Sequence, residues 1–430
     1  MGAGSGMGGR RGGFSLRNLQ TFSSLKNPVY RLFYVGMLGQ MVGMNIQMFA
    51  RTWLIARLTE SPLVVGAMSF AHAIPMLFLS LFGGAIADRV HKKYVMLIGQ
   101  IVSAIFSLGV GLALALGYLS PERTFTILGM VLPSWSILVL ASMGQGIVMA
   151  LMMPSLQTIL PEIVGEEQLM NAISLSNMGM NTIRVFAPAI TGFLINAFDY
   201  DAVYYVMTGM YFMSAVFFVF LPRTRKITVR NISALASIRA GFNYLRHQTT
   251  ILLIVLLSLM VILFSMPYQM LLPFFCTDIL NVDEGGGGLL MSVSGAGAIV
   301  GSLILASLPN KKRGLMMLAS SVILGLALTG FSFSTIWFLS IGLIIFVGIG
   351  QSVNMTLGNT MIQYYVEPEY RGRVTSILMM QFGIMSLGTF IAGAMAESMG
   401  VQWALGGFAI ILILISILSL AFLPRIRKLD

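Results

Sequence analysis

The chain alternates long apolar segments with short polar loops. Windows of about 19 residues, the length that crosses a bilayer as a helix, identify apolar segments along the whole chain. They lie at residues 30–57, 62–87, 93–118, 132–160, 168–197, 201–221, 246–279, 287–308, 314–333, 335–365, 371–398 and 401–423. The strict alternation that a membrane β-barrel strand requires is missing. The pattern therefore predicts an all-α membrane protein with twelve transmembrane helices.

A polar stretch divides these segments into two sets of six. Residues 222–245 are rich in Arg and Lys, amphipathic in places and too polar to cross a membrane. We expect a cytoplasmic linker there, between an N-terminal six-helix bundle at 28–221 and a C-terminal six-helix bundle at 246–424. Residues 1–27 begin with a Gly-rich stretch and are expected to form a disordered cytoplasmic tail, and 425–430 a second tail.

The basic residues predict the orientation of the helices. If both termini are cytoplasmic, all but four of the 26 Lys and Arg fall on the cytoplasmic side, as basic loop residues do in membrane proteins. The exceptions are Arg51, Arg57, Arg123 and Arg184. An odd number of helices would destroy this asymmetry. We therefore expect a multi-pass protein of a plasma membrane with both termini in the cytoplasm.

Composition narrows the class further. With 57% hydrophobic and 10% charged residues, the chain is not a soluble globule, and its partner is the lipid bilayer. The net charge of +11 is scattered through short loops, which favours orientation over nucleic-acid binding. The single Cys276 excludes an intrachain disulfide. Because no nucleotide motif, catalytic triad or metal-ligand set is found, we expect no cofactor, no metal and no enzymatic activity.

One loop concentrates glycine and charge. Between the second and third segments the chain reads Gly84-x-x-x-Asp88-Arg89-x-x-Lys92-Lys93. This loop, in a twelve-helix context, resembles the signature of the major facilitator superfamily. The fold implied is that of two six-helix bundles that rock around a central site to give alternating access.

The resemblance also implies a role for this loop as a gate. Asp88 would latch against the positive N-terminal end of helix eleven, near Arg371 and Arg373. The basic residues of the loop would hold neighbouring helix ends and lipid phosphates. Alternatively, they only fix the orientation of the chain.

The fifth segment carries a second motif. Arg184, Pro188 and Gly192 lie in a stretch that looks like a degraded form of the Gly-Pro-x-x-Gly-Gly motif of superfamily antiporters, with Ala187 and Thr191 in place of two glycines. Pro188 would bend the helix, and small residues would permit close packing against a neighbour. The alternative is an ordinary proline kink.

Together these features resemble a narrower group, the efflux permeases that include macrolide and enterobactin exporters. That resemblance implies proton-coupled antiport of amphipathic molecules. One departure concerns helix four, where many proton-coupled members have Arg three residues before Gln-Gly. Here Gln145-Gly146 follow Ser142, so the arginine is missing or has moved.

Polar residues inside the apolar segments are the candidates for a substrate cavity, because charge within a bilayer is costly. Arg184 either binds an anionic group of the substrate or pairs with an acid from another helix. In the first helix, Gln40, Gln47 and Arg51 project within a narrow arc. The full set of cavity candidates is Gln40, Gln47, Arg51, Gln145, Arg184, Gln269, Asn354 and Gln381.

A proton-coupled transporter needs a group that titrates within the protein. The candidates are Glu397 near the end of helix eleven, Asp278 at the end of helix seven, and His72 close to Pro75. Both acids can equally be solvated at the outer face, and a lone histidine is more often a packing residue.

The sequence therefore favours a secondary active transporter, expected to be bacterial and monomeric, that exports drug-like or siderophore-like amphipathic molecules in exchange for protons. The alternative is a lipid or lysolipid translocator of the same fold. A membrane enzyme or a sensor that does not transport is the third, weaker hypothesis.

Overall fold

A computed structural model describes residues 22–127, 130–223, 234–309, 311–367, 369–378, 380–427 and 429. Within these ranges some stretches, among them 80–89 and 234–239, are described by their backbone alone. Asp88 and Arg89 are among these, so their side-chain contacts lie outside the described part of the chain.

The N-terminal half forms a helical bundle. After the short turn η2 (Ser23–Lys26) it contains α1 (Pro28–Thr59), α2 (Pro62–Arg89), α3 (Lys92–Ala115), α4 (Ser136–Ile163) and α5 (Glu166–Val219). Helix α5 joins the fifth and sixth expected segments across a kink at Asp199, whose φ of 66° is left-handed. Asn27 begins the bundle, because its side chain accepts from the first free N–H groups of α1.

The C-terminal half forms a second bundle, which follows the linker helix α6 (Ala234–His247). Its elements are α7 (Thr249–Ser265), α8 (Pro267–Phe275), the π-helical turn η3 (Cys276–Leu280), α9 (Glu284–Ser307), α10 (Arg313–Ser332), α11 (Trp337–Tyr365), α12 (Arg371–Leu378), α13 (Gln381–Met399), α14 (Val401–Phe422) and α15 (Pro424–Arg427). The expected segment 246–279 is thus divided where Pro267 begins α8. The expected segment 371–398 is divided between α12 and α13.

The fourth segment starts later than the hydropathy pattern predicts. A hairpin of β1 (Thr124–Ile127) and β2 (Met130–Pro133) precedes α4, with Phe125 opposite Leu132. Alternating Thr and apolar residues favour a strand, and Ser134 N–H donates to the Arg123 carbonyl to close the pair. The first residues of the expected helix 132–160 therefore belong to a β-hairpin.

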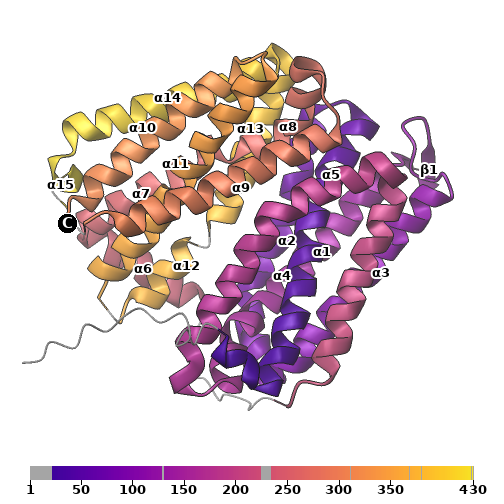
Figure 1. Ribbon diagram of the computed structural model, residues 1–430, viewed down its shortest axis with the longest axis horizontal. Helices are drawn as coiled ribbons and strands as arrows, with labels where there is room; N and C mark the ends of the chain where they lie inside the picture. Colours follow the sequence, from indigo (N-terminus) through magenta and orange to yellow (C-terminus); the bar gives the residue numbers. More distant parts are fainter. Residues whose placement is uncertain are drawn as a thin grey trace, which may run out of the picture.

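Ten of the described helical segments are long and apolar enough to cross a membrane. One of them is α5, which holds two expected crossings. Helix α1 is not among the ten, because Gln40, Asn45, Gln47 and Arg51 dilute its apolar composition. The described helices are consistent with twelve crossings in two bundles, which Figure 1 shows side by side, meeting along α5 and α9.

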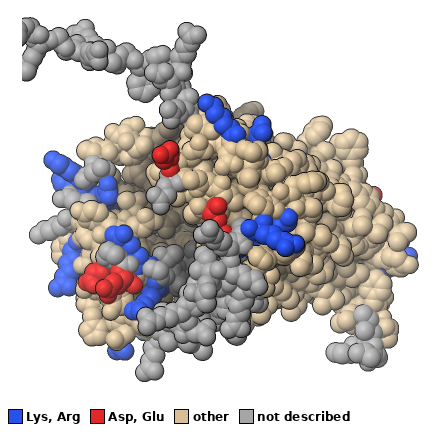
Figure 2. Space-filling model, turned by 90° about the horizontal axis from the view of Figure 1, so that it is seen from below, with Lys and Arg blue, Asp and Glu red and all other residues tan. Residues whose placement is uncertain are grey.

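Two opposite ends of the molecule are used below. The hairpin end carries the β-hairpin, the loop at 60–61, the kink at Asp199 and the loop at 281–283. The linker end carries the starts of α1, α3 and α7 and the helices α6 and α12. Figure 2, seen from the side on which α6 and α12 lie, shows Lys and Arg at several places on that face.

The apolar core differs between these two ends. At the hairpin end one continuous cluster joins both bundles and includes Ile55 of α1, Tyr204 of α5, Phe275 of α8 and Ala396 of α13. Toward the linker end each bundle has its own cluster, one around Phe33 and one around Ile254. The bundles therefore share a core at the hairpin end and have separate cores at the linker end.

Candidate functional site

Close backbone contacts join the bundles along α5 and α9. A Cβ on Gly192 would overlap the Glu284 carbonyl oxygen, and one on Gly288 would overlap that of Pro188. Pro188 has no N–H to donate within α5. The N–H of the next residue, Ala189, donates to Ser292 Oγ of α9 (3.1 Å). Small residues thus let the two backbones approach closely.

The same kind of contact joins α2 and α13. A Cβ on Gly66 would lie 2.9 Å from the Phe390 Cα, and one on Gly393 would lie 2.5 Å from the Pro62 carbonyl oxygen. The ring of Phe70 meets that of Phe390 edge-on at 5.3 Å. Two glycine-mediated helix pairs therefore hold the bundles together.

Carboxylates of the C-terminal bundle complete the closure at the hairpin end. Glu397 Oε2 accepts from Ser61 Oγ (2.9 Å) and from the Leu63 N–H (3.4 Å) at the start of α2. The N-terminal end of a helix attracts a carboxylate, so this contact favours closure.

Two further acids bind α5 from the start of α9. Asn196 Nδ2 donates to Asp283 Oδ2 (2.7 Å), and the Tyr200 hydroxyl donates to Glu284 Oε1 (3.0 Å). Hydrogen bonds to an ionised acceptor are stronger than neutral ones. All these contacts lie at the hairpin end, on the same side as the shared core.

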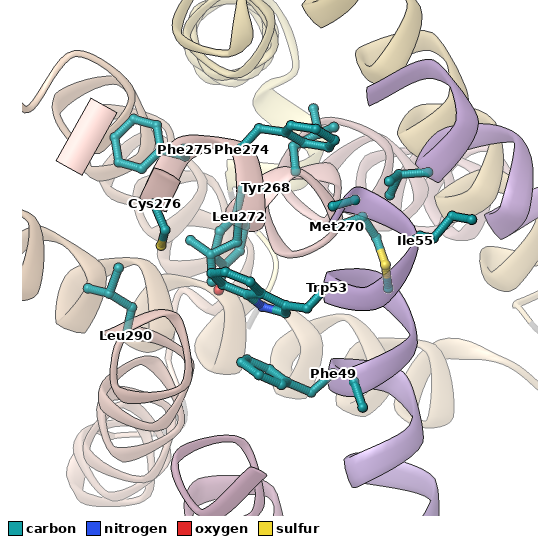
Figure 3. Packing of buried hydrophobic residues seen from close by; sticks show 14 of the residues in the cluster. Phe49, Trp53, Ile55, Tyr268, Met270, Leu272, Phe274, Phe275, Cys276 and Leu290 are labelled. Atoms are coloured by element: carbon teal, nitrogen blue, oxygen red, sulfur yellow. The ribbon is translucent and has the colours of Figure 1, made fainter. Parts of the chain in front are cut away.

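An interbundle pocket lies beneath this closure. Met48, Phe49, Thr52 and Trp53 of α1, Gln269 and Met270 of α8, and Met291 of α9 line it. Figure 3 shows Phe49 and Trp53 extending from α1 toward Tyr268 and Leu272 of α8. Trp53 packs directly against Gly287 of α9, and Thr52 Oγ1 donates to Met270 Sδ (3.4 Å). Both bundles thus contribute to one mainly apolar pocket.

Gln269 is the cavity candidate that lines this pocket. Its Nε2 donates to the Tyr268 hydroxyl (3.5 Å), which pairs with Ser294 Oγ (3.1 Å) on α9. Arg184 lies on the facing helix α5, where Gly295 of α9 packs against the backbone of Val185 and Arg184. The Arg184 side chain is exposed, and its charge acts on the Tyr268 hydroxyl. The structure brings Arg184 and Gln269 to the same interbundle region.

Gln47 and Arg51 instead face the interior of the N-terminal bundle. The Tyr211 hydroxyl donates to Gln47 Oε1 (2.9 Å), and Arg51 Nη1 lies 3.4 Å from His72 Nδ1. The same His72 nitrogen lies 3.2 Å from the Ser142 carbonyl oxygen. Gln47, Arg51 and Ser142 line a small cavity bordered by α1, α3, α4 and α5. His72 therefore contacts the backbone of Ser142, three residues before Gln145-Gly146.

Three other cavity candidates are enclosed within one bundle. Gln145 Oε1 accepts from Ser103 Oγ (3.1 Å) between α4 and α3. Asn354 bonds both Ser320 and Ser321 of α10. Gln40 is buried in α1, with its Oε1 lacking a partner among the described residues.

Gln381, the eighth candidate, is half-buried and begins α13. Of the acids proposed for proton coupling, Glu397 is part of the closure described above. Asp278 is exposed in η3 and accepts from the neighbouring Thr277 hydroxyl.

The described part of the predicted gate lies at the linker end. Lys92 is buried, and its Nζ bonds Glu162 of α4 and the Thr158 carbonyl (3.1 Å). Lys93 is half-buried. Gly84, Asp88 and Arg89 lie outside the described side chains. Lys92 thus connects α3 to α4 within the N-terminal bundle.

Arg371 and Arg373 lie beside the linker helix. Arg371 Nε donates to the Val366 carbonyl (3.2 Å), and the Arg373 guanidinium lies 5.0 Å from the Tyr370 ring. Tyr370 stacks on Tyr244 of α6, with 4.2 Å between ring centroids. These contacts hold α6 against α12.

The sequence analysis missed the residues that form the closure. Ser61 and Asp283 lie in loops and Asn196 and Tyr200 beside the kink of α5, where polar and aromatic residues are expected in any membrane protein. Their pairing depends on which helices of the two bundles are neighbours. A run of small residues at the start of α9, facing the small residues of α5, was the available signal.

Comparisons with known proteins agree with this architecture. The profile of the family described as transmembrane secretion effector matches residues 19–430. Macrolide efflux protein A of Streptococcus pyogenes is 23% identical over 93% of this chain and 97% of its own length. The enterobactin exporter of Shigella boydii serotype 4 is 26% identical over 92% and 89%.

Among solved structures, the nucleoside transporter NupG has a TM-score of 0.70 and 16% identity, covering 91% of this chain and 98% of that one. At this identity the likeness shows a shared fold. The efflux resemblance inferred from the motifs is confirmed by the family profile and the named relatives. The chain belongs to the transmembrane secretion effector family of the major facilitator superfamily, a family of membrane transporters.

Proposed function

We propose that this protein exports amphipathic small molecules by alternating access, in exchange for protons, with drug-like or siderophore-like compounds as cargo. The observation that carries this is the division of the core: one cluster joins the bundles at the hairpin end, and separate clusters fill them toward the linker end. Relatives named for macrolide efflux and enterobactin export support the direction.

We also propose that the linker end and both termini are cytoplasmic and that a monomer is the working unit. The distribution of Lys and Arg supports this orientation. The structure then corresponds to a state closed to the outside, with the interbundle pocket beneath that closure. Asp88 would stabilise the opposite state, in which the linker end is closed.

His72 is the group in the described membrane-spanning part best placed to couple protons. If its Nδ1 carries a proton, it donates to the Ser142 carbonyl; if not, it accepts from Arg51. A protonated imidazole carries N–H on both ring nitrogens and cannot accept, so protonation of His72 would break the Arg51 contact. Tyr204 and Tyr211 are the other titratable groups around Arg51 in the described residues.

Proteoliposomes with an imposed pH gradient test this function. We expect gradient-dependent efflux of a catechol siderophore, reduced about tenfold or more by Asp88→Asn, since an amide does not carry the charge that a helix N-terminus attracts. His72→Gln should retain substrate binding and lose the dependence on the gradient. Movement of fluorescent lipid alone, without the gradient, would replace this proposal with a lipid translocator.

A further inference from the structure

Two arginines in the membrane-spanning part, Arg51 and Arg184, have no carboxylate partner among the described residues. The ion pairs among the described residues are Arg57–Asp199 and Lys92–Glu162, both at helix ends. Every described acidic residue lies at or near the end of a helix, in a loop, or at the kink of α5. Arg184 and Arg51 therefore have no acidic neighbour within the described bundles that neutralises them.

The lack of a described acidic partner distinguishes between the two explanations for Arg184, an anionic group of the substrate or an acid from another helix. A guanidinium stays charged in a protein, and charge at membrane depth is compensated by a partner or by water. The structure offers no carboxylate partner among the described residues and leaves the Arg184 side chain exposed. The opposite charge is then available from a ligand in the space between the bundles.

The surroundings of Arg184 suit a ligand with one polar and one apolar end. The hydrogen-bonded series Gln269, Tyr268 and Ser294 lies on the facing helices α8 and α9. Beyond Gln269 the pocket wall is apolar and includes Trp53 and Met291. Aromatic and methionine side chains accommodate apolar groups of varied shape.

We infer that the cargo is an organic anion with an apolar body, and that Arg184 binds its carboxylate or an equivalent oxyanion. The apolar body lies against Trp53 and the methionines of the interbundle pocket. A cationic amphiphile of the same shape meets a guanidinium there with no acid to balance it, so it is rejected. This inference rests on the proposed function, because it assigns the interbundle pocket to the cargo.

Three probes that share one ring system and differ in charge test whether the Arg184 site prefers an anion. Binding of radiolabelled naphthylacetate, naphthylacetamide and naphthylethylamine is measured at neutral pH on the purified full chain. We expect the carboxylate to bind about tenfold more tightly than the amine, since a charge-assisted contact contributes at least this much. Arg184→Gln should remove that preference and leave amide binding unchanged, while Arg184→Lys should retain part of it.

Arg57→Gln is the matched control, because Arg57 is an exposed arginine at the hairpin end that pairs with Asp199. It should not change the preference for the carboxylate. Thermal unfolding of each variant checks that the fold is kept. Equal or tighter binding of the amine, no binding of the carboxylate, or an equal loss of all three probes in Arg184→Gln overturns the inference.

Transport assays separate this inference from the proposed function. Selective binding of the carboxylate without gradient-driven efflux would refute the transport proposal and leave the anion site standing. Efflux of the amine that Arg184→Gln does not affect would refute the anion site and leave export standing. Vesicles with fluorescent phosphatidylglycerol form a further arm: movement of this lipid alone would assign Arg184 to a lipid headgroup and overturn a soluble cargo.

Discussion

Arg51 places a guanidinium inside the N-terminal bundle beside a histidine and two tyrosines rather than an acid. Its described hydrogen-bond contact is with His72 Nδ1, at 3.4 Å. A charge held in a bundle without an opposite charge lowers stability, because the lost hydration is only partly replaced. A charged residue at membrane depth that lowers stability is expected to serve function.

Replacing Arg51 by methionine should therefore raise stability and abolish transport. Methionine matches the length of the arginine stem and carries no charge, and replacing buried charge by apolar groups often stabilises a protein. We expect the midpoint of thermal unfolding to rise by about 2–5 °C. Light-scattering or fluorescence melts in detergent measure the midpoint, and proteoliposome efflux measures transport.

Arg57→Met is the control for this pair of measurements. Arg57 is exposed and its partner Asp199 is solvated, so its loss should change the midpoint little. A fall in the midpoint of Arg51→Met would show instead that Arg51 holds the bundle together.

The helix pairs α5/α9 and α2/α13 form the closure, and glycine sets how near their axes approach. Gly288 and Gly192 leave no room for a side chain between α5 and α9. Because these contacts lie on the hairpin side of both helices, they form in the state seen here and must separate if the hairpin end opens. Bulk at these glycines should act on the conformational equilibrium more than on folding of either bundle.

Gly288→Val should shift the population toward a state open at the hairpin end. The valine side chain would overlap the Pro188 carbonyl, so the closed arrangement loses one of its close backbone contacts. Spin labels at the two hairpin-end loops, read by pulsed distance measurements, should report a longer mean distance. Transport should fall, because the cycle needs both states and the populations of the two states become unequal.

Gly209→Ala provides the matched control on α5, because nothing lies within 4 Å of a Cβ there. It should leave both the distance distribution and the transport rate unchanged. An unchanged distance in Gly288→Val would mean that the α5/α9 contact tolerates bulk and does not limit closure.

In the proposed transport cycle the two bundles move as rigid units, and in this structure a shared core and three acids join them at the hairpin end. Ser61 and Glu397 belong to different bundles, whereas Arg57 and Asp199 belong to the same one. Rocking of the bundles changes the first distance and leaves the second unchanged. This difference can be tested directly with cross-links.

A disulfide between Ser61→Cys and Glu397→Cys should form readily and stop transport. Reduction should restore the activity, because the link fixes only the relative position of the bundles. The pair Arg57→Cys and Asp199→Cys should cross-link without stopping transport. Native Cys276 is buried and should not interfere. Transport that continues in the first cross-linked pair would contradict bundle rocking at this end.

Much of the fold was predictable because each membrane-crossing helix must be apolar over the thickness of the bilayer, which its own sequence shows. Apolar windows placed the crossings to within a few residues, as for α9 and α14. The small β-hairpin and the turn at Met380 before α13 were not predicted, since both involve short segments that local hydropathy does not resolve. The left-handed kink at Asp199 falls in the expected gap between two helices, and its geometry came only from the structure.

The candidate site was predictable as a list of polar residues and not as a set of neighbours. Helical periodicity placed Gln40, Gln47 and Arg51 on one face, and that face turns into the N-terminal bundle. Asn354 meets serines of its own bundle, whereas Gln269 meets the other bundle. Nothing within a single helix distinguishes these cases.

From the sequence follow the membrane-spanning class, the two sets of six segments, the asymmetry of basic charge and the scarcity of acids between the helix ends. These properties depend on composition and spacing within each segment, because every helix must present apolar residues to the bilayer whatever its neighbours are. The tertiary structure added which end is closed, which carboxylates form the closure, and that Arg184 lies on α5 opposite α9 with no ion-pair partner among the described residues. Those properties depend on contacts between helices far apart in the chain, because the partner of a polar group is set by packing and not by its own segment.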